Sequence, residues 1–542
     1  MEILETNFNE KLPEILEVIE KADFIGIDLE FTGLNQTSTF SHPFASVASF
    51  YNRIQKTFEG FIVIQLGITA FWVHPDDEKK FQCKSFNIYL YPRGRKSVFR
   101  FEGSCLDFLA GNGFDFNKLF TKGVAYCSVH DAEKLKGQLA KKHKEKRKQL
   151  ISKEPDVSSH IQVPEQEQEV VNKACEEIDK FLESADQEEV VFDSYNGFQR
   201  KLIYQTIEGK YFTQVSASPK DLERNRKGIV ITRKKTLDEE IKLFEEKCQE
   251  EIKKLETEIG VTHIFQALSK SRKLLVCHNM FLDLIYLMRQ FTGPLPEDLD
   301  EFKKLVHDFF PNVLDTKHLC TKEVLKEVVG SSVLPHVLEA CRSSLFQLPE
   351  IESLGDQKYT LDDSKEHEAG YDSFITGVCF LALTNHLGIL PKDLNANCKK
   401  LKSFKNKIFV LGLDNITCCN LTGPDEKPSR EHVFHVTFPS TWKNTDIIQH
   451  FKNFGPIQIK WINETSAYVA LQQREYSQSV MKSIGRYPGV TVVPYAEYED
   501  AQSPHEDRKR KLPVSSSQES GEKAVKKAKT TTSKIFPENS DW

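Results

Sequence analysis

The sequence has no apolar run that approaches the about 20 residues needed to cross a membrane. Its first residues, Met-Glu-Ile-Leu-Glu, are acidic and do not form a signal peptide. It also has no Cys-x-x-Cys pair, and most of its 12 cysteines stand singly in apolar runs, as at Cys277, Cys320 and Cys379. This spacing argues against a disulfide framework and against a structural zinc site. We therefore expect a reduced, soluble, intracellular protein with no membrane contact.

An excess of charge of one sign is missing as well. Lys and Arg total 73 and Asp and Glu total 79, which gives a net charge of -6. That balance excludes a chain that is basic throughout, whereas nucleic-acid binding needs only local basic patches. At about 100–200 residues for each domain, 542 residues with 39% hydrophobic content predict three or four domains.

Mixed helix and strand patterns occupy two separated stretches, about 1–130 and 262–395. The elements expected there are a helix at 12–22, strands at 24–31, 61–68 and 85–91, a strand at 273–277 that leads into a helix through 287, an apolar helix at 372–387 and a further strand at 406–412. The predicted fold class is α/β, with a mixed sheet flanked by helices and an insertion between its two halves.

A basic run follows the first stretch at 134–148 and holds eight Lys or Arg residues and one Glu, and an acidic stretch comes after it at 165–189. We interpret both as solvated helix faces or linkers, and contact of the basic run with a phosphate backbone is the alternative. Residues 192–232 predict a small module with a helix and a strand. From 237 to 259 apolar residues recur at helical spacing, and this stripe either packs on its own domain or pairs with another chain as a short coiled coil.

The C-terminal part has a β-α-β-β-α-β rhythm over 432–498, which is typical of a split-βαβ unit of about 70 residues. Residues 501–542 are rich in Ser, Lys, Glu and Thr, so we expect disorder there.

Two carboxylates stand two residues apart on one of the predicted apolar strands. The period of two places Asp28 and Glu30 on the same face. Burying two like charges side by side is costly unless something neutralises them, and a hard divalent cation with oxygen ligands does so. A strand end at the surface, with both acids solvated, explains this pair equally well.

Three further residues favour a metal site. Asp283 interrupts the apolar run of a predicted helix, Asp372 is expected in the first turn of another, and His367 lies on the loop before it, where Gly370 would allow a bend. Four carboxylates in three separated motifs suit phosphodiester cleavage by two cations, which stabilise both the attacking and the leaving oxygen.

Each residue then has an expected role. Asp28 would bridge two divalent cations, and Glu30, Asp283 and Asp372 would complete their coordination. Mg²⁺ is the expected ion because it binds carboxylates and keeps waters that a substrate can displace. His367 would act as the base that takes a proton from the attacking water.

This pattern of Asp-x-Glu, a later Asp and His-x4-Asp resembles the DEDD exonucleases that carry a catalytic histidine. Longer motifs resemble one family of them, the poly(A)-specific ribonucleases, which are cap-interacting deadenylases. The motifs span residues 1 to about 500 and include Ile27–Phe31, Gly113–Lys118, Gly197–Thr206, His278–Met280, Leu314–Lys317, His367–Asp372 and Trp461.

The resemblance implies a magnesium-dependent 3′-to-5′ exoribonuclease that shortens poly(A) tails and releases 5′-AMP. It also implies the domain order. A ribonuclease-H-like DEDD nuclease core would occupy 1–150 and 260–400, interrupted by a small α+β nucleic-acid-binding module at 170–245. An RRM-like α+β domain at 430–500 and a disordered basic tail at 501–542 would follow.

The inserted module resembles the single-strand-binding modules named for an Arg-x-x-x-His pair. Here the pair reads Arg200-x-x-x-Tyr204, so the His is absent, and Arg200 is expected to meet phosphates. In the RRM-like domain the third strand, 465–471, lacks the usual exposed aromatic residues, which weakens the case for base stacking across the sheet.

The family uses a tryptophan of this last domain to stack on the 7-methylguanosine cap of mRNA, and Trp461 matches it. A positively charged methylated purine is attracted to an indole face. Packing of Trp461 in the domain core is the alternative interpretation.

The resemblance further implies that Phe31, Leu34 and Lys317 contact the adenine chain, with Asp315 beside Lys317 as an indirect contributor. It also implies a homodimer that is present in both nucleus and cytoplasm. Two basic clusters of the tail resemble a bipartite nuclear import signal, with solvated linker charge as the alternative. The clusters consist of Arg508, Lys509, Arg510, Lys511, Lys526, Lys527 and Lys529.

Three other functions fit part of this pattern. One is a protein that binds capped, polyadenylated RNA without cutting it, and another is a DEDD exonuclease acting on DNA. The third is the membrane-anchored paralogous trimming exonuclease, against which the basic C-terminus and the 197–206 motif argue.

Overall fold

A computed structural model describes residues 1–34, 43–94, 98–151, 160–184, 187–222, 226–234, 237–355, 358–483 and 489–502. The chain divides into two compact units, Met1–Pro428 and a second that begins at Ser429. The basic clusters at 508–511 and 526–529 lie outside the described residues. None of the helices described is both long and apolar enough to cross a membrane.

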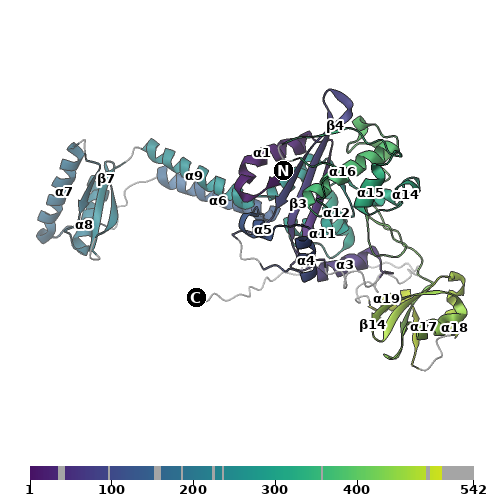
Figure 1. The fold of residues 1–542 in the computed structure, drawn as a ribbon. Helices are drawn as coiled ribbons and strands as arrows, with labels where there is room; N and C mark the ends of the chain where they lie inside the picture. The colour runs from purple at the N-terminus through teal and green to yellow at the C-terminus, as the bar shows by residue number, and fades with distance from the viewer. Residues whose placement is uncertain are drawn as a thin grey trace, which may run out of the picture. The chain divides into compact units, whose positions relative to one another are not determined.

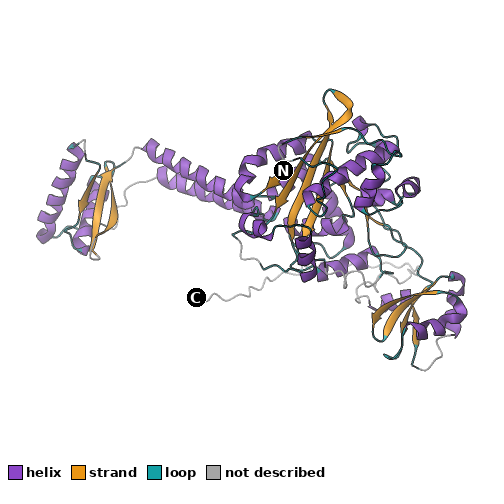
Figure 2. Cartoon of the chain, in the orientation of Figure 1, coloured by secondary structure: helices purple, strands orange, loops and turns teal. Residues whose placement is uncertain are grey.

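The first unit is built on a mixed seven-stranded sheet with the order β1-β4-β3-β2-β8-β9, in which β10 also pairs with β4. Figure 2 shows strands of this unit in orange, with purple helices beside them. Its strands are β1 (Glu2–Ile3), β2 (Phe24–Phe31), β3 (Val63–His74), β4 (Asp77–Tyr89), β8 (Leu274–Cys277), β9 (Val313–Asp315) and β10 (Ile351–Ser353). Strand β2 is antiparallel to β3 and parallel to β8. The expected α/β class and its mixed sheet are confirmed, because β8 and β9, which follow the insertion, extend the sheet that β2, β3 and β4 begin.

Helices cover both faces of this sheet. They are α1 (Glu5–Lys21), α3 (Val47–Thr57), α4 (Gly103–Gly111), α5 (Phe116–Lys122), α10 (Thr262–Ser271), α11 (Phe281–Thr292), α12 (Leu299–Phe309), α13 (Thr316–Cys320), α14 (Glu323–Val329), α15 (Leu334–Cys341) and α16 (Ala369–His386). Figure 1 shows α16 alongside β3, and this helix contacts β2, β3 and β4. Almost all of α16 is buried, which explains why its sequence is apolar all round.

The alternation of side chains along β2 separates two hydrophobic cores. Ile25, Ile27 and Leu29 pack in the core that α1, α3 and α11 share, whereas Phe24 packs in the core that contains α16. Since strand residues two apart share a face, Asp28 and Glu30 lie on the α16 side of the sheet.

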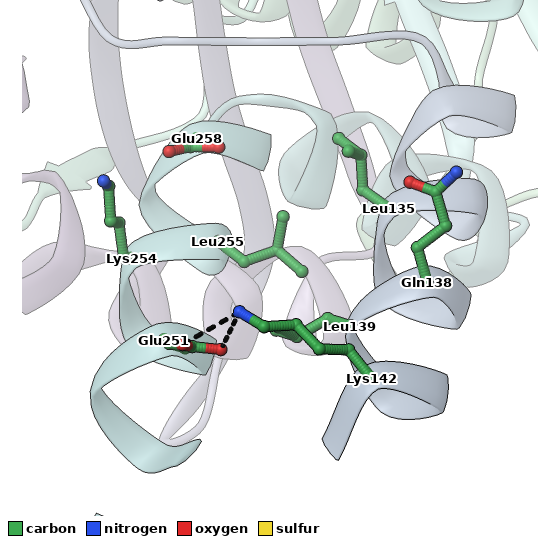
Figure 3. Close-up of a pocket in the computed structure, with 8 residues that line it drawn as sticks. All are labelled: Leu135, Gln138, Leu139, Lys142, Glu251, Lys254, Leu255 and Glu258. Atoms are coloured by element: carbon green, nitrogen blue, oxygen red, sulfur yellow. Dashed lines mark hydrogen bonds and ion pairs between the residues drawn. The ribbon is translucent and has the colours of Figure 1, made fainter. Parts of the chain in front are cut away.

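Two long helices, α6 (Val129–Ile151) and α9 (Leu237–Ile259), run side by side in the first unit (Figure 1). Lys142 of α6 donates to both carboxylate oxygens of Glu251 on α9, at 2.9 and 2.8 Å, beside leucines from both helices (Figure 3). Lys136 Nζ of α6 lies 3.1 Å from one carboxylate oxygen of Glu256 on α9. The basic run is therefore part of one helix with an acidic partner, and α9 contacts this helix of its own chain. Pairing of the apolar stripe with another chain stays an alternative prediction.

Between α6 and α9 in the sequence lies a small module with its own core. Its elements are α7 (Gln168–Glu183), β5 (Glu189–Phe192), α8 (Gly197–Lys210), β6 (Val215–Leu222) and β7 (Arg226–Arg233). The strands form an antiparallel sheet with the order β5-β7-β6. This is the α+β character expected of the insertion.

A short hairpin ends the first unit. It consists of β11 (Lys407–Phe409) and β12 (Cys418–Asn420). The strand expected at 406–412 is thus real but shorter. Beyond it, the Val410 N–H still donates across the hairpin to the Thr417 carbonyl at 3.2 Å.

The second unit is a four-stranded antiparallel sheet with the order β14-β15-β13-β16. Its elements are β13 (Val433–Thr437), α17 (Asn444–Phe451), β14 (Ile457–Asn463), β15 (Ser466–Leu471), α18 (Ser477–Ser483), β16 (Thr491–Pro494) and α19 (Tyr495–Gln502). The β-α-β-β-α-β prediction is confirmed. Helix α19 was not expected, and disorder from 501 was wrong for its last two residues.

Helix α19 covers part of the sheet of the second unit. The Tyr498 ring stacks on His435 of β13 with centroids 3.6 Å apart, and Tyr468 of β15 donates to the Glu499 carboxylate at 3.2 Å. The one tyrosine of the third strand is therefore buried under this helix, so base stacking on that part of the sheet is not available in this arrangement.

Candidate active site

Strand β2 presents both of its acids toward α16. Asp28 pairs in register with Gly67 of β3, and Glu30 pairs with Gln65. Both side chains are half-buried. The surface interpretation of this pair, with both acids fully solvated at a strand end, is therefore wrong.

The start of α16 supplies two more predicted residues. Asp372 lies in the first turn of the helix, as expected, and its Oδ2 accepts a hydrogen bond from the His367 backbone N–H at 3.0 Å. His367 stands on the approach loop with φ of 69°. The bend is thus made at His367 and not at Gly370, which is already inside the helix.

Polar side chains from the central strands hold this first turn in place. Gln65 Oε1 accepts from the Ala369 N–H at 2.9 Å, and Asn87 Oδ1 accepts from the Gly370 N–H at 3.0 Å. Both side chains are buried, and they satisfy N–H groups that have no partner inside the helix. We did not predict these residues from the sequence, although a Gln and an Asn inside otherwise apolar strands were a usable signal.

Gly67 lets the helix approach the strand. A Cβ at this position would lie 1.8 Å from the Ala369 carbonyl oxygen and 2.1 Å from its carbon. Only glycine leaves room for such a contact between two backbones. The distance from Asp28 on β2 to the start of α16 therefore depends on a residue of the neighbouring strand.

Asp283 reaches the site from α11, in the first turn of that helix. The loop before it is fixed by Asp315 at the end of β9, whose carboxylate accepts from the backbone N–H groups of Asn279 at 2.9 Å and Met280 at 3.2 Å. Met280 caps α11, so Asp315 determines where this helix begins.

Burial and the charges of neighbouring acids raise the pKa of all four carboxylates. Burial, and then the charges of Asp372 and Asp283, raise the pKa of both Asp28 and Glu30 well above the ordinary values. Burial is also the main cause that raises the pKa of Asp283 to about 8 and that of Asp372 to about 7. A bound cation relieves the repulsion that Asp28 and Glu30 experience from Asp372 and Asp283.

Three of the predicted residues form one compact donor set. Each of Glu30, His367 and Asp372 offers one ligand atom, and these atoms lie within 4.8 Å of one another. Asp28 and Asp283 join them electrostatically, as the pKa shifts indicate. Carboxylate oxygens are hard ligands, so this set fits a divalent cation such as Mg²⁺.

His367 is exposed on one side and touches an aromatic ring on the other. Phe108 of α4 meets it edge to face, with centroids 4.6 Å apart. Burial lowers the pKa of His367, and the nearby charge of Glu366 opposes the shift. A neutral imidazole at pH 7 is able to accept a proton.

The residues expected to contact the adenine chain lie on elements that carry the acidic residues of the site, or on segments next to those elements. Phe31 follows Glu30 on β2 and stacks on Tyr286 with centroids 4.4 Å apart. The Leu34 N–H donates to the Glu102 carboxylate at 2.8 Å. Lys317 follows Asp315 on α13, and its Nζ lies 5.3 Å from the centre of the Phe409 ring.

Arg200 belongs to the small inserted module. Its Nη1 donates to the carbonyl oxygens of Tyr195 and Lys227, each at 2.8 Å, so this nitrogen ties the start of α8 to β7. Tyr204, at the position of the missing His, has a buried hydroxyl with no partner among the residues described. The contact of Arg200 with phosphates stays a prediction.

Trp461 lies on β14 of the second unit and is 36% exposed. Its Nε1 donates to Asn444 Oδ1 at 2.6 Å, and its ring meets Phe438 edge to face at 5.0 Å. Core packing alone does not describe it, because over a third of this residue's surface reaches solvent.

Comparison with known proteins gives relatives over almost the whole chain. Residues 3–380 match the CAF1 family ribonuclease model, and residues 423–501 match an RNA binding domain. Poly(A)-specific ribonuclease PARN of Xenopus laevis is 34% identical over 99% of this chain and 87% of its own length, and that of Homo sapiens is 35% identical over 97% and 84%.

More distant relatives are also found. Poly(A)-specific ribonuclease PNLDC1 of Mus musculus is 26% identical over 92% of this chain and 94% of its own length. Among solved structures, S. pombe Pop2p in its Mg²⁺ and Mn²⁺ bound form covers 73% of this chain and 98% of its own, with 14% identity and a TM-score of 0.33.

Proposed function

Because the chain belongs to the CAF1 ribonuclease family and, within it, to the poly(A)-specific ribonucleases, we propose that it removes poly(A) from the 3′ end of RNA. In this proposal the reaction uses two divalent cations, expected to be Mg²⁺, and releases 5′-AMP. It is a poly(A)-specific 3′-exoribonuclease. The observation that supports the metal-dependent chemistry most directly is the convergence of Glu30, His367 and Asp372 within 4.8 Å, beside two further acids.

In this proposal Asp28, Glu30, Asp283 and Asp372 hold the cations. When bound, the cations neutralise the carboxylates and stabilise the charge that develops on the attacking and leaving oxygens. His367 takes a proton from the attacking water at a ring nitrogen, for which its lowered pKa suits it. Gln65 and Asn87 keep Asp372 and His367 in place by holding the first turn of α16.

The substrate end of the RNA would lie along Phe31, Leu34 and Lys317. An aromatic side chain offers a stacking surface to any base, and a lysine offers a charge to the backbone. The preference for adenine is proposed on the basis of the family, since stacking and charge alone do not distinguish bases.

The test is cleavage of a 5′-labelled RNA that ends in an adenosine tract, with Mg²⁺ and with chelator, by the wild type, Asp28→Ala and Glu78→Ala. Glu78 is an exposed acid on β4, away from β2, and serves as the matched control. We expect stepwise shortening to AMP only with metal and intact Asp28. RNA that is bound but left whole under every metal tried would support the non-cutting alternative, and equal cleavage of DNA would contradict RNA specificity.

We propose in addition that Trp461 binds the 7-methylguanosine cap. The partly exposed indole, which is hydrogen-bonded to Asn444, supports this role because its orientation is set before the cap arrives. Calorimetric titration of 7-methyl-GTP and of GTP into the wild type, Trp461→Ala and Trp442→Phe tests it. Preference for the methylated nucleotide should vanish in Trp461→Ala and persist in Trp442→Phe.

A homodimer, a place in both nucleus and cytoplasm and a nuclear import signal at 508–511 and 526–529 are also proposed on the basis of the family. Sedimentation of the full chain tests the dimer. Replacing the seven basic residues with Ala and following a fluorescent fusion in cells tests the signal, and unchanged nuclear entry would refute it.

A further inference from the structure

The segment between the two matched domains is built into the nuclease. The family matches cover residues 3–380 and 423–501, so the β11–β12 hairpin lies outside both of them. We propose that Phe409, on β11, is a positioning residue that holds the Lys317 ammonium for a phosphate of the RNA. The proposal rests on the proposed function, in which Lys317 contacts RNA.

The hairpin is anchored to the nuclease at both of its ends. Before β11, Asn406 exchanges hydrogen bonds with Val313 of β9, from its N–H to the Val313 carbonyl at 2.7 Å and from the Val313 N–H to its Oδ1 at 3.0 Å. After β12, the Asp425 carboxylate accepts from Lys303 of α12 at 2.6 Å, and this lysine is buried. A segment held in this way is not a free linker between domains.

One buried carboxylate connects the hairpin to Lys317. Asp315 Oδ2 accepts from the Phe409 N–H at 3.0 Å, and its Oδ1 accepts from the Lys317 N–H at 2.9 Å. The same carboxylate holds Asn279 and Met280 before α11. The backbones of Phe409 and Lys317 therefore share one fixed reference point, which is only 1% exposed.

The two side chains then meet. Lys317 Nζ lies 5.3 Å from the centre of the Phe409 ring and donates to the Ser332 carbonyl at 3.1 Å. In the part of the chain that the structure describes, no carboxylate forms an ion pair with Lys317. An ammonium has three donors, so the carbonyl and the ring leave at least one for an incoming anion.

Holding the lysine in advance favours binding for a physical reason. A free lysine side chain loses conformational freedom when it is fixed, and a ligand that meets a lysine already held in place avoids part of that cost. The ring face of Phe409 attracts the Lys317 ammonium but leaves its positive charge in place, whereas a carboxylate would neutralise that charge. Phe409 is half-buried beside Lys317. An uncharged aromatic ring at this position suits a site that must attract phosphate, because it holds the lysine and leaves the positive charge unchanged.

The experiment is a double-mutant cycle on the full chain with Phe409→Leu, Lys317→Met and both together. KM and kcat are measured with adenosine-tract RNA and Mg²⁺, and the Kd of the same RNA is measured with chelator. Phe409→Tyr keeps an aromatic ring, and Leu411→Ala alters an exposed apolar residue of the same hairpin as the matched control.

We expect Phe409→Leu to raise KM and Kd about two- to tenfold, the range of a cation–π contact, with kcat unchanged. Phe409→Tyr should keep KM and Kd at their wild-type values, and Leu411→Ala should leave both unchanged. In the Lys317→Met background Phe409→Leu should have no further effect, because the residue acts through the lysine.

Two outcomes would overturn the inference, and they separate its own failure from failure of the proposed RNA contact of Lys317. If Lys317→Met weakens RNA binding but Phe409→Leu changes nothing, or changes it equally in both backgrounds, Phe409 does not position the lysine. If Lys317→Met binds RNA as tightly as the wild type, the proposed RNA contact fails and the inference fails with it. If Phe409→Leu fails to fold, its Tm is lowered, and the test then depends on Phe409→Tyr. A KM of Phe409→Tyr above the wild-type value would contradict the proposal.

Discussion

Glu30 and Asp372 come from opposite ends of the nuclease sequence, and the structure brings their carboxylates, together with His367, within 4.8 Å of one another. The approach depends on α16 lying directly on β3 at Gly67. Without a cation, the folded chain must therefore accommodate a Glu30 whose pKa is raised by burial and by the charge of Asp372.

Replacing one acid should separate stability from activity. Asp28→Asn removes one of four crowded charges and keeps the size of the side chain, so we expect the metal-free protein to gain about 1 kcal/mol or more, seen as a higher Tm. Activity should fall about 10³-fold or more, because cation binding is worth several kcal/mol in the transition state. Thermal melts in chelator and initial rates with Mg²⁺ check the two halves.

The same variant should also lose the stabilisation that Mg²⁺ gives. A ligand at 100 times its Kd stabilises the folded state by about 2.7 kcal/mol, and a site that no longer binds gives no rise in Tm. A full Mg²⁺-induced rise in Asp28→Asn would mean that the cation binds elsewhere.

Metal binding should depend on pH between about 6 and 9. The pKa of Asp372 is raised to about 7 and that of Asp283 to about 8 in the metal-free protein, both above the unfolded value near 4. The folded state then binds the protons more tightly, so the stability present at low pH is lost as the pH rises through 7 and 8. Mg²⁺ needs the ionised acids, so the rise in Tm that it causes should be larger at pH 9 than at pH 6.

Melts with and without Mg²⁺ across this range, repeated with Asp372→Asn, test the assignment. The variant should show a weaker fall in metal-free stability with pH. An identical fall in variant and wild type would remove Asp372 as a cause.

Gly67→Ala should damage the site without touching a functional side chain. The added Cβ meets the backbone of Ala369, which cannot rotate away, so we expect a loss of about 3 kcal/mol or more in stability. A shift of about 1 Å in Asp372 and His367 would lower the rate about 10²-fold. Gly137→Ala in α6, where a Cβ meets nothing within 4 Å, is the control and should be neutral or stabilising.

The burial of His318 on α13 predicts that the folded state becomes less stable in acid. It is fully buried, both ring nitrogens lack a partner among the described residues, and burial lowers its pKa to about 4. The unfolded chain, with a pKa near 6.5, takes the proton first, so stability is lost as the pH falls from 6.5 toward 4.

His318→Leu should flatten that loss and be neutral or stabilising at pH 8, since an unsatisfied buried polar atom costs about 1–3 kcal/mol. Urea denaturation at pH 5 and pH 8 measures both effects. The exposed His336→Leu is the control, and a pH dependence that survives in His318→Leu would assign the effect to another group.

The sequence alone predicted the α/β class, the split-βαβ unit at 432–498 and the placement of Asp28 and Glu30 on one strand face. These features follow from local periodicity, because a period of two or of 3.6 fixes which residues share a face before any packing occurs. The family resemblance rested on the same local motifs, and it is confirmed by relatives over nearly the whole chain.

Only the tertiary structure decided how α16 meets the sheet, where the chain bends at His367, and that Gln65, Asn87 and Asp315 hold the elements that carry the acids. It also placed the β11–β12 hairpin against Lys317 and α19 on the sheet of the second unit. The physical reason is that these contacts join residues far apart in the chain. Their geometry depends on backbone approach and on buried hydrogen bonds between elements, which no local pattern records.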